Sequence, residues 1–562
     1  MDHTLIAGLG SEDRLSRLGD GVLGHILSFL TAKEAARATT LSSRWRDILA
    51  SVHTVSMEEP EGPIPEYDHG SRSYELREPD PTLPFTVVVT AALFARSRRP
   101  APGAASPPLR ALRVSMESYG GLDAFPVDQW VTYAVKHSAP ELEVDLRVRR
   151  VPICHRPYAY HPAAPAAGSD GDTAVYGGKA HVTPEEVDYS DDELDDTAEA
   201  ASTDDSSDET DSYWRRSPAV YTVPSRLFSC ATLRSLRLGS CNLSPPAVIS
   251  LPSLEALHLT HVPDDGEHVQ RLISASPHLA DLTLEACATV KVLSLLDNSC
   301  LRRLIILCCH NLATVTVDAQ ELQAFEYRGA VRGNSFLSVR GNGGSLPSIK
   351  SCKIDVCAVC VEKEATSEED LAALGSFLLP FASTTKRLHL RAARMGSCFV
   401  ALPAFPAVRH LQLNGRVLCG DDRTAAVATV CTILRRAPDL ELLTLFFEPA
   451  PLKSGYNKYL HRKRKVSKFV DAHHLHYNKY DTVDCETSAI PPCLETRVKH
   501  IRLWHYQGGR AQRTLARFLL RNARVLEKVY CEFAEGPLSI QTKLMREMEG
   551  WLVNEEASKE FL

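Results

Sequence analysis

Closely spaced cysteines are the residues in this sequence that first suggest chemistry. Cys352, Cys357 and Cys360 include one C-x-x-C pair, and a Cys-Cys-His run occupies 308–310. Thiolates and imidazoles bind zinc, but a structural site normally closes a tetrahedron from two such pairs. Only one close pair is clear here, and these cysteines fall at or near strand-like repeats where buried thiols are expected. With no glycine-rich phosphate loop, G-x-S-x-G or H-E-x-x-H present, we predict no metal site, no cofactor and no catalytic residue.

A second polar group lies in the segment 449–492, which we predict to be irregular. His473, His474 and His476 could bind a metal, and HRKRK at 461–465 is typical of a nuclear import signal or a phosphate-contacting patch. A solvated basic loop accounts for these residues at least as well. No nucleic-acid recognition module accompanies the basic run, so nucleic-acid binding is the weaker interpretation.

One acidic segment makes the net charge of the chain negative, although the remaining residues together are basic. The 562 residues carry a formal charge of −7, yet 14 acidic residues and no Lys or Arg lie between Glu185 and Asp211, and without them the rest carries +7. The segment 158–212 has too little apolar surface to order itself, so we predict a disordered insertion. An acidic docking tail and a phosphorylation target are the alternatives. No apolar run is long enough to span a membrane, and sixteen scattered cysteines without an export signal favour the cytosol or nucleus.

Leucines recur with a fixed period that must organise these segments. The pattern L-x-x-L-x-L appears at 233–243, 254–262, 279–287 and 301–309, with weaker copies at 322–329, 349–357, 386–392, 408–415, 440–447 and 498–506. The central anchors Leu236, Leu257, Leu282, Leu304 and Phe325 are 21, 25, 22 and 21 residues apart. This spacing matches the period of leucine-rich repeats.

The pattern predicts an α/β solenoid. The last two leucines of each copy point inward from one short strand, and one coil cannot bury its apolar face alone, so copies stack. We expect earlier coils over 83–157, where apolar positions at helical spacing also predict a helix over 127–137, and the main repeats over 213–448. Further repeats are expected over 493–548.

A small all-α unit of three helices is expected over 11–55. Asp20 is predicted to cap a helix that starts at Gly21. Thr31 and Glu34 fit a capping box for a second helix, and Ser42 or Ser43 can cap a third. Their apolar surface exceeds what three short helices can cover, so the excess implies a partner, either the adjoining repeats or another protein.

This unit resembles the F-box, the helical module that docks on the Skp adaptor of SCF ubiquitin ligases. The resemblance rests on DRLSRLGDGVLGHILSFLTAKEAARATTLSSRWRDIL at 13–49, where Gly19 replaces the usual proline and leaves the first turn looser. The segment 127–146 resembles the early repeat of plant F-box/leucine-rich-repeat proteins, and 493–533 resembles their C-terminal FBD region. The resemblance implies adaptor contacts from these side chains: Leu18, Val22, Leu23, Ile26, Leu27, Leu30 and Trp45.

The function that the resemblance implies is substrate recognition in an SCF-type E3 ubiquitin ligase. The adaptor would connect the chain to a cullin-RING ligase, and the solenoid would bind a protein target of unknown identity. Target contacts are expected at strand positions between the inward leucines, such as Arg237, His258, Thr283 and Ile305. The alternative is an interaction scaffold that delivers no target to ubiquitin.

Overall fold

The computed structural model describes a defined set of residues. They are 17–30, 52–59, 66–68, 73–75, 84–97, 108–116, 119–146, 220–318, 320–330, 336–340, 346–356, 368–417, 425–448, 474–481, 483 and 489–562, with Glu34, Arg37, Ala38, Arg44 and Ile48. All of these residues belong to one compact unit. No helix in these ranges is long and apolar enough to cross a membrane.

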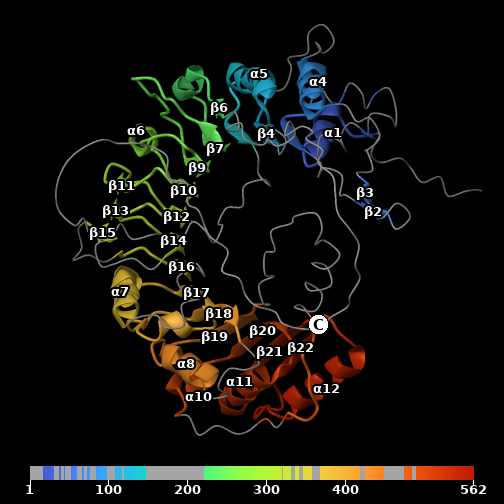
Figure 1. The fold of residues 1–562 in the computed structure, drawn as a ribbon, viewed down its shortest axis with the longest axis vertical. Helices are drawn as coiled ribbons and strands as arrows, with labels where there is room; N and C mark the ends of the chain where they lie inside the picture. Colours follow the sequence, from blue (N-terminus) through green and yellow to red (C-terminus); the bar gives the residue numbers. More distant parts are fainter. Residues whose placement is uncertain are drawn as a thin grey trace, which may run out of the picture. The chain divides into compact units, whose positions relative to one another are not determined.

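A parallel sheet of 15 strands organises the described residues, and its strands follow chain order (Figure 1). Each strand therefore pairs with a strand of the next coil. The strands are β1 (Thr54–Glu58), β4 (Ala111–Met116), β5 (Glu141–Leu146), β7 (Ser235–Gly239), β9 (Ala256–Thr260), β10 (Asp281–Glu285), β12 (Arg303–Leu307), β14 (Ala324–Gly329), β16 (Ser351–Val356), β17 (Arg387–Arg394), β18 (His410–Arg416), β19 (Leu442–Phe447), β20 (His500–Tyr506), β21 (Lys528–Phe533) and β22 (Ser558–Phe561).

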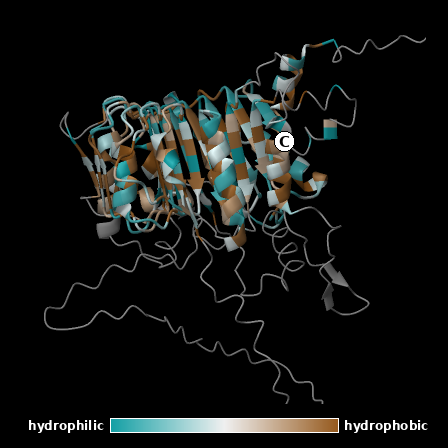
Figure 2. Ribbon diagram, turned by 90° about the horizontal axis from the view of Figure 1, so that it is seen from above, coloured by the Kyte–Doolittle hydropathy of each residue, from teal (hydrophilic) through white to brown (hydrophobic). Residues whose placement is uncertain are grey.

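The register of the sheet follows the leucine pattern. Leu236, Leu257, Leu282, Leu304 and Phe325 lie side by side on successive strands. They are buried, as are the leucines that open each strong copy. Apolar and polar residues alternate along the strands, visible as coloured bands in Figure 2. This confirms the predicted α/β leucine-rich-repeat solenoid.

Helices lie along the outer side of the sheet and cover its apolar face (Figure 1). They are α4 (Phe85–Ser97), α5 (Ala124–Lys136), α6 (Gly266–Ser274), α7 (Glu368–Leu378), α8 (Ala425–Leu434), α10 (Pro492–Thr496), α11 (Arg510–Asn522) and α12 (Leu538–Glu549), with short 3-10 turns at Gly121–Asp123, Ser225–Ser229, Leu379–Phe381 and Ser397–Phe399. Helix α5 covers the helix predicted over 127–137 except for its last residue, His137, which is the C-cap. We call the opposite face of the sheet, which carries the residues between the buried anchors, the open face.

Short strands complete the coils between these helices. A parallel ladder joins β11 (Val292–Leu295), β13 (Thr314–Val317) and β15 (Leu337–Val339), and β6 (Tyr221–Thr222) pairs with β8 (Cys241–Asn242). An antiparallel pair, β2 (Glu66–Asp68) and β3 (Ser73–Glu75), follows β1.

The sheet is longer than the sequence predicts at both ends. Its first strand, β1, pairs with β4 and starts at Thr54, well before the expected start near residue 83. Its last strand, β22, pairs with β21 and ends at Phe561, beyond the predicted limit of 548. Neither strand carries the leucine pattern, because β1 reads TVSME and β22 reads SKEF. The predicted insertion 158–212 lies outside the described residues.

Candidate functional site

The first helix, α1 (Asp20–Leu27), begins one residue earlier than predicted. Gly19 is its N-cap, with an extended backbone, and no side chain caps the helix. The expectation that Asp20 caps it is therefore wrong. The Asp20 carboxylate instead accepts hydrogen bonds from Nε and Nη2 of Arg44 at 2.9 and 2.8 Å. Arg44 also donates to the carbonyl oxygen of Leu18, which ties the start of α1 to a later helical segment.

The apolar stripe of α1 is divided between two environments. Leu23 and Leu27 are 0 % and 2 % exposed and form a small core with Ile48 and Val52. Leu18 and Ala38 pack against this core from its edge. Leu23 and Leu27, which were predicted to contact the adaptor, are therefore not on the surface, because their side chains hold the helical module together. By helical module we mean the described residues between Arg17 and Val52.

The other apolar side chains of this segment face solvent. Val22, Ile26 and Leu30 are 50 %, 37 % and 38 % exposed, and Phe29, which was not among the predicted adaptor contacts, is 78 % exposed. The Phe29 ring makes an edge contact with His25, with ring centroids 4.9 Å apart. We call Val22, Ile26, Phe29 and Leu30 the α1 patch. Trp45, the predicted capping box at Thr31 and the alternative caps Ser42 and Ser43 lie outside the described residues.

The helical module is connected to the sheet at Val52 and His53. Val52 belongs to the module's core, and β1 begins two residues later. His25 Nδ1 lies 2.9 Å from His53 Nε2. Arg96 of α4 donates from Nε to the carbonyl oxygen of Val52 at 2.9 Å. Burial, and then the charge of His25, lower the pKa of His53, which favours its neutral form at this junction. The module is thus attached to the first coil by direct contacts.

The open face over β4–β14 forms a groove of about 650 Å³. Arg237, His258 and Thr283, which are predicted target contacts, line it. Ile305 also lines it but is only 8 % exposed, so it offers a target little surface.

Charges in this groove largely neutralise one another. Arg113 binds Glu141 at 2.9 Å, and Arg237 lies 3.5 Å from Glu143. His258 Nε2 lies 3.4 Å from Glu285, and this hydrogen bond is the main cause that lowers the pKa of Glu285. Such pairing leaves little free charge to attract a partner electrostatically.

Asp145 is the exception on this part of the open face. Burial raises its pKa to about 6, and the charge of Arg237 opposes the shift only in part. Its carboxyl group lies directly against Gly239 of β7, where any Cβ would collide with the carboxylate. Gly239 therefore makes room for Asp145, and its position explains why this carboxyl group is desolvated.

The candidate cysteines and histidines that the structure describes do not form a metal site. Cys352 and Cys309 are buried, and burial is the largest cause that raises the pKa of the Cys352 thiol. In the part of the chain that the structure describes, no three His, Cys, Asp or Glu side chains gather as metal ligands. His474 Nδ1 instead lies 2.9 Å from the carbonyl oxygen of Glu535. Cys357, Cys360, His473 and the basic run 461–465 lie outside the described residues.

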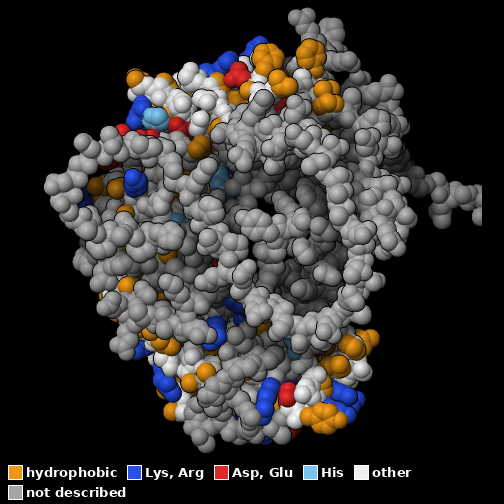
Figure 3. All heavy atoms as spheres, viewed as in Figure 1, with side chains coloured by type: hydrophobic (Ala, Val, Ile, Leu, Met, Phe, Trp, Pro, Cys, Tyr) orange, Lys and Arg blue, Asp and Glu red, His pale blue; other side chains and the backbone are white. Residues whose placement is uncertain are grey.

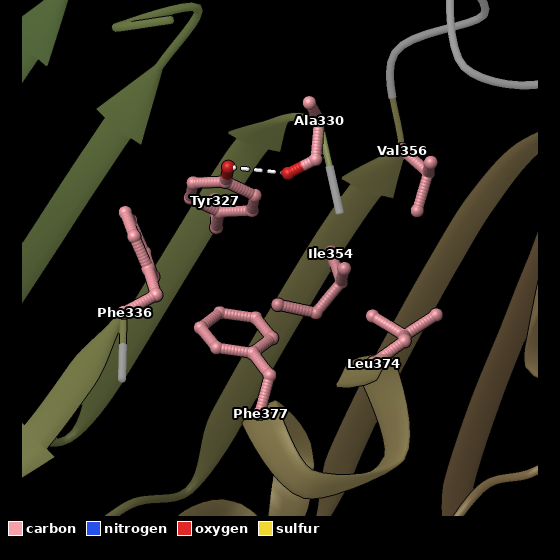
Figure 4. A pocket seen from close by; sticks show the side chains of 7 residues that line it. All are labelled: Tyr327, Ala330, Phe336, Ile354, Val356, Leu374 and Phe377. Atoms are coloured by element: carbon pink, nitrogen blue, oxygen red, sulfur yellow. Dashed lines mark hydrogen bonds between the residues drawn. The ribbon is translucent and has the colours of Figure 1, made fainter. Parts of the chain in front are cut away.

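A small cavity lies under the sheet between β14, β16 and α7. The rings of Tyr327, Phe336 and Phe377 line it, with aliphatic side chains from β16 and α7 (Figure 4). The Tyr327 hydroxyl donates to the carbonyl oxygen of Ala330 at 2.7 Å, which leaves an apolar space of about 10 Å³. That volume is at the lower limit for one water molecule, so the cavity is a packing gap and offers no room for a ligand.

Comparison with known proteins gives two matches to family models. The model described as At1g61320/AtMIF1, LRR domain, matches residues 213–362, and the FBD model matches residues 486–530. The second match covers β20, α11 and the start of β21.

Curated proteins of Arabidopsis thaliana are similar to parts of the chain. The putative F-box/LRR-repeat protein At4g00320 is 24 % identical over 283 residues, which cover 49 % of this chain and 40 % of the relative. The F-box protein At3g59000 is 32 % identical over 137 residues, 24 % of each chain. The putative F-box/LRR-repeat protein At5g38386 is 58 % identical over 40 residues, 7 % of this chain and 10 % of the relative. The chain thus spans less than half the length of each.

The sheet register and the matching models define a leucine-rich-repeat protein with an FBD region. Parts of the chain are thus similar to plant F-box/leucine-rich-repeat proteins and to the FBD region. This similarity suggests a protein-binding role of the F-box type.

Proposed function

We propose that this chain is the substrate-recognition subunit of an SCF-type E3 ubiquitin ligase, acting in the cytosol or nucleus. The helical module binds the Skp adaptor, which connects it to a cullin-RING ligase, and the open face of the solenoid binds a protein target. The chain catalyses no step itself. It raises the effective concentration of the target near the ubiquitin-transferring machinery.

The α1 patch is the observation that carries this proposal. Four large apolar side chains, Val22, Ile26, Phe29 and Leu30, face solvent on a module whose described core consists of four residues. Burying a large apolar side chain contributes about 1.5–3 kcal/mol, and association costs offset part of the total. The patch therefore has enough apolar surface to bind a partner protein. Leu23 and Leu27 support it from beneath by fixing α1 on the module.

Attachment to the first coil supports the same division of roles. The contacts of His53 and Arg96 at the end of the module hold it beside β1 and α4. A target on the open face and an adaptor on the α1 patch would then be kept at a restricted separation. Restricting that separation is what a proximity catalyst requires.

The test is capture of a purified Skp adaptor by the full chain. Val22→Asp combined with Ile26→Asp places two charges in the α1 patch without changing the module's core. We expect capture to be lost, with an unchanged thermal unfolding curve. The matched control, Val248→Asp with Leu538→Asp, places the same charges on two exposed apolar residues of the solenoid. The control should capture the adaptor like the unaltered chain. Full capture by the patch variant would contradict the proposal.

A scaffold that binds the adaptor without promoting degradation is the second candidate, and Gly19 is the residue that favours it. The family pattern has proline there, and glycine leaves the start of α1 with more conformational freedom to lose. The two candidates differ in one measurement. A bound target whose half-life is unchanged when the protein is deleted supports the scaffold, and a lengthened half-life supports the ligase subunit.

A further inference from the structure

The open face over β17–β20 carries a group of cationic side chains that come from separate coils. Arg387 on β17 pairs in register with His410 on β18, His410 with Leu442 on β19, and Leu442 with His500 on β20. Arg502 lies two residues further along β20 on the same face. We call Arg387, His410, His500 and Arg502 the cationic cluster.

Several other cations on the open face have acidic partners. Lys353 binds Glu326 at 2.6 Å, Arg391 binds Asp355 at 3.0 Å and also Glu448, and Lys528 binds Glu560 at 2.6 Å. The first coils show the same pairing, with Arg113 and Arg237 next to glutamates.

The cationic cluster lacks such partners. Among the described residues, none of its four side chains lies within ion-pair distance of a carboxylate. Positive charge that no neighbouring carboxylate neutralises is suited to binding an external anion.

The charges of the other cluster residues act on His410. Burial lowers the pKa of His410 first, and then the charge of Arg387, with smaller contributions of the same sign from Arg502 and His500. Glu441, which precedes β19, opposes this shift. The groups that act on His410 therefore come from β17, β20 and the turn before β19.

The size of the cluster indicates the form of its ligand. Neighbouring parallel strands lie about 4.8 Å apart, so Arg387 and His500 are separated by about 15 Å across three strand spacings. One small anion cannot contact both. An extended peptide covers about 15 Å with four to five residues. Apolar and aromatic side chains adjoin the cluster: Leu442 lies between His410 and His500, and the rings of Trp504 and Tyr530 are 4.8 Å apart.

We propose that the cationic cluster binds an acidic segment of the target protein, with anionic groups about four to five residues apart. This inference rests on the proposed function, since it names the class of target that the open face selects. Carboxylates and phosphates share the required chemistry. Apolar residues between the anionic groups would contact Leu442 and the Trp504 ring.

The test is fluorescence anisotropy with the full chain and a labelled serine-glutamate peptide in which two Glu-Glu pairs lie about five residues apart. A glutamine version of the peptide removes the charge, and a phosphoserine version replaces the carboxylates. We expect the glutamate or phosphoserine peptide to bind and the glutamine peptide to fail. Tighter binding of the phosphoserine peptide would identify phosphate as the source of charge, and equal binding would show that carboxylates suffice.

Arg387→Gln with Arg502→Gln should weaken binding about tenfold or more. The matched control, Arg234→Gln with Arg302→Gln, removes two exposed arginines from surface ion pairs outside the cluster and lowers net charge equally. The control should bind like the unaltered chain. Equal weakening by both pairs, or equal binding of the glutamine peptide, would overturn the inference.

Two further readouts sharpen this test. Binding should strengthen between about pH 8 and about pH 6, because a bound anion favours the protonated form of His410, and His410→Gln should reduce this dependence. Adaptor capture by the cluster variant should be unchanged. Adaptor capture without peptide binding would overturn the acidic-segment inference alone. Cluster-dependent peptide binding without adaptor capture would overturn the ligase proposal alone.

Discussion

The helical module and the solenoid use apolar side chains in opposite ways. The solenoid buries its leucines in one continuous core, from Val55 on β1 to Leu552 beyond α12. The described core of the module is Leu23, Leu27, Ile48 and Val52, and the α1 patch stays exposed beside it. Hydrophobic side chains also gather at the end of the molecule that carries α4 and α5 (Figure 3). Phe94 and Phe125 are exposed there.

This difference explains how one chain presents two kinds of surface. A stacked core holds the strands in register, so the open face can vary in charge without loss of fold. The module holds only enough apolar contact to orient α1, and it leaves the rest available to a partner. Variants in the two cores should therefore have separate consequences.

The largest expected effect comes from the solenoid core. Leu282→Ala removes a fully buried anchor between Leu257 and Leu304 and should lower the free energy of unfolding by about 2–5 kcal/mol. Chemical denaturation measures this loss. Adaptor capture should stay intact, because the cavity lies in a coil distant in sequence from the module. Leu23→Ala provides the opposite case, since it should impair adaptor capture and leave the main unfolding transition in place. Loss of adaptor capture by both variants would contradict the separate roles of the solenoid core and the module core.

A smaller effect, dependent on pH, is expected at Asp145. Its folded-state pKa of about 6 lies above the ordinary value, so the folded protein binds a proton more tightly than the unfolded chain does. The stabilisation that protonated Asp145 contributes to the folded state is fully present below about pH 4. It is lost as the pH rises through about 6. Asp145→Asn should therefore stabilise the solenoid by about 1–2 kcal/mol at neutral pH, after allowance for its partial exposure.

Thermal unfolding of both proteins across this pH range measures the difference. The two curves should converge at acidic pH, where Asp145 is protonated. A destabilised Asp145→Asn variant at neutral pH would show that the ionised carboxylate contributes a favourable interaction with Arg237.

The smallest effect is expected at the start of α1. Gly19 has φ −66°, the value that proline fixes, and a Cβ there would meet nothing within 4 Å. Gly19→Pro should stabilise the module by about 0.4–1 kcal/mol by restricting the unfolded chain. Adaptor affinity should rise slightly, as measured by calorimetric titration. Weaker binding would show that the partner needs freedom at this turn.

The solenoid could be predicted from the sequence because the inward leucines set both the repeat period and the pairing register of the strands. Inward leucines at fixed spacing must stack, and Leu236, Leu257 and Leu282 do so. Strand β1 was missed because Val55 and Met57 point inward without the leucine pattern. Strand β22, which reads SKEF, has no buried residue and also lacks the leucine pattern.

The division of the α1 stripe could not be derived from helical spacing alone. One broad face of the helix carries Val22, Leu23, Ile26 and Leu27. Leu23 and Leu27 are the buried members because Ile48 and Val52 pack against them. Phe29 was missed although it lies three residues after Ile26 and seven after Val22, which are spacings of one helix face.

The cationic cluster was missed because its members are distant in the sequence and become neighbours only through strand register. One signal was nevertheless present. Arg387, His410 and His500 each immediately precede the first buried residue of their strand. Aligning the repeats by their anchors therefore brings these three side chains into one row.

The most direct test of the central claim is amide hydrogen exchange of the full chain with and without the Skp adaptor. The account predicts slower exchange in peptides covering residues 17–30, with no change in β17–β21, because the adaptor binds the α1 patch and leaves the open face free for a target. Slower exchange on the open face strands, with residues 17–30 unaffected, would contradict it.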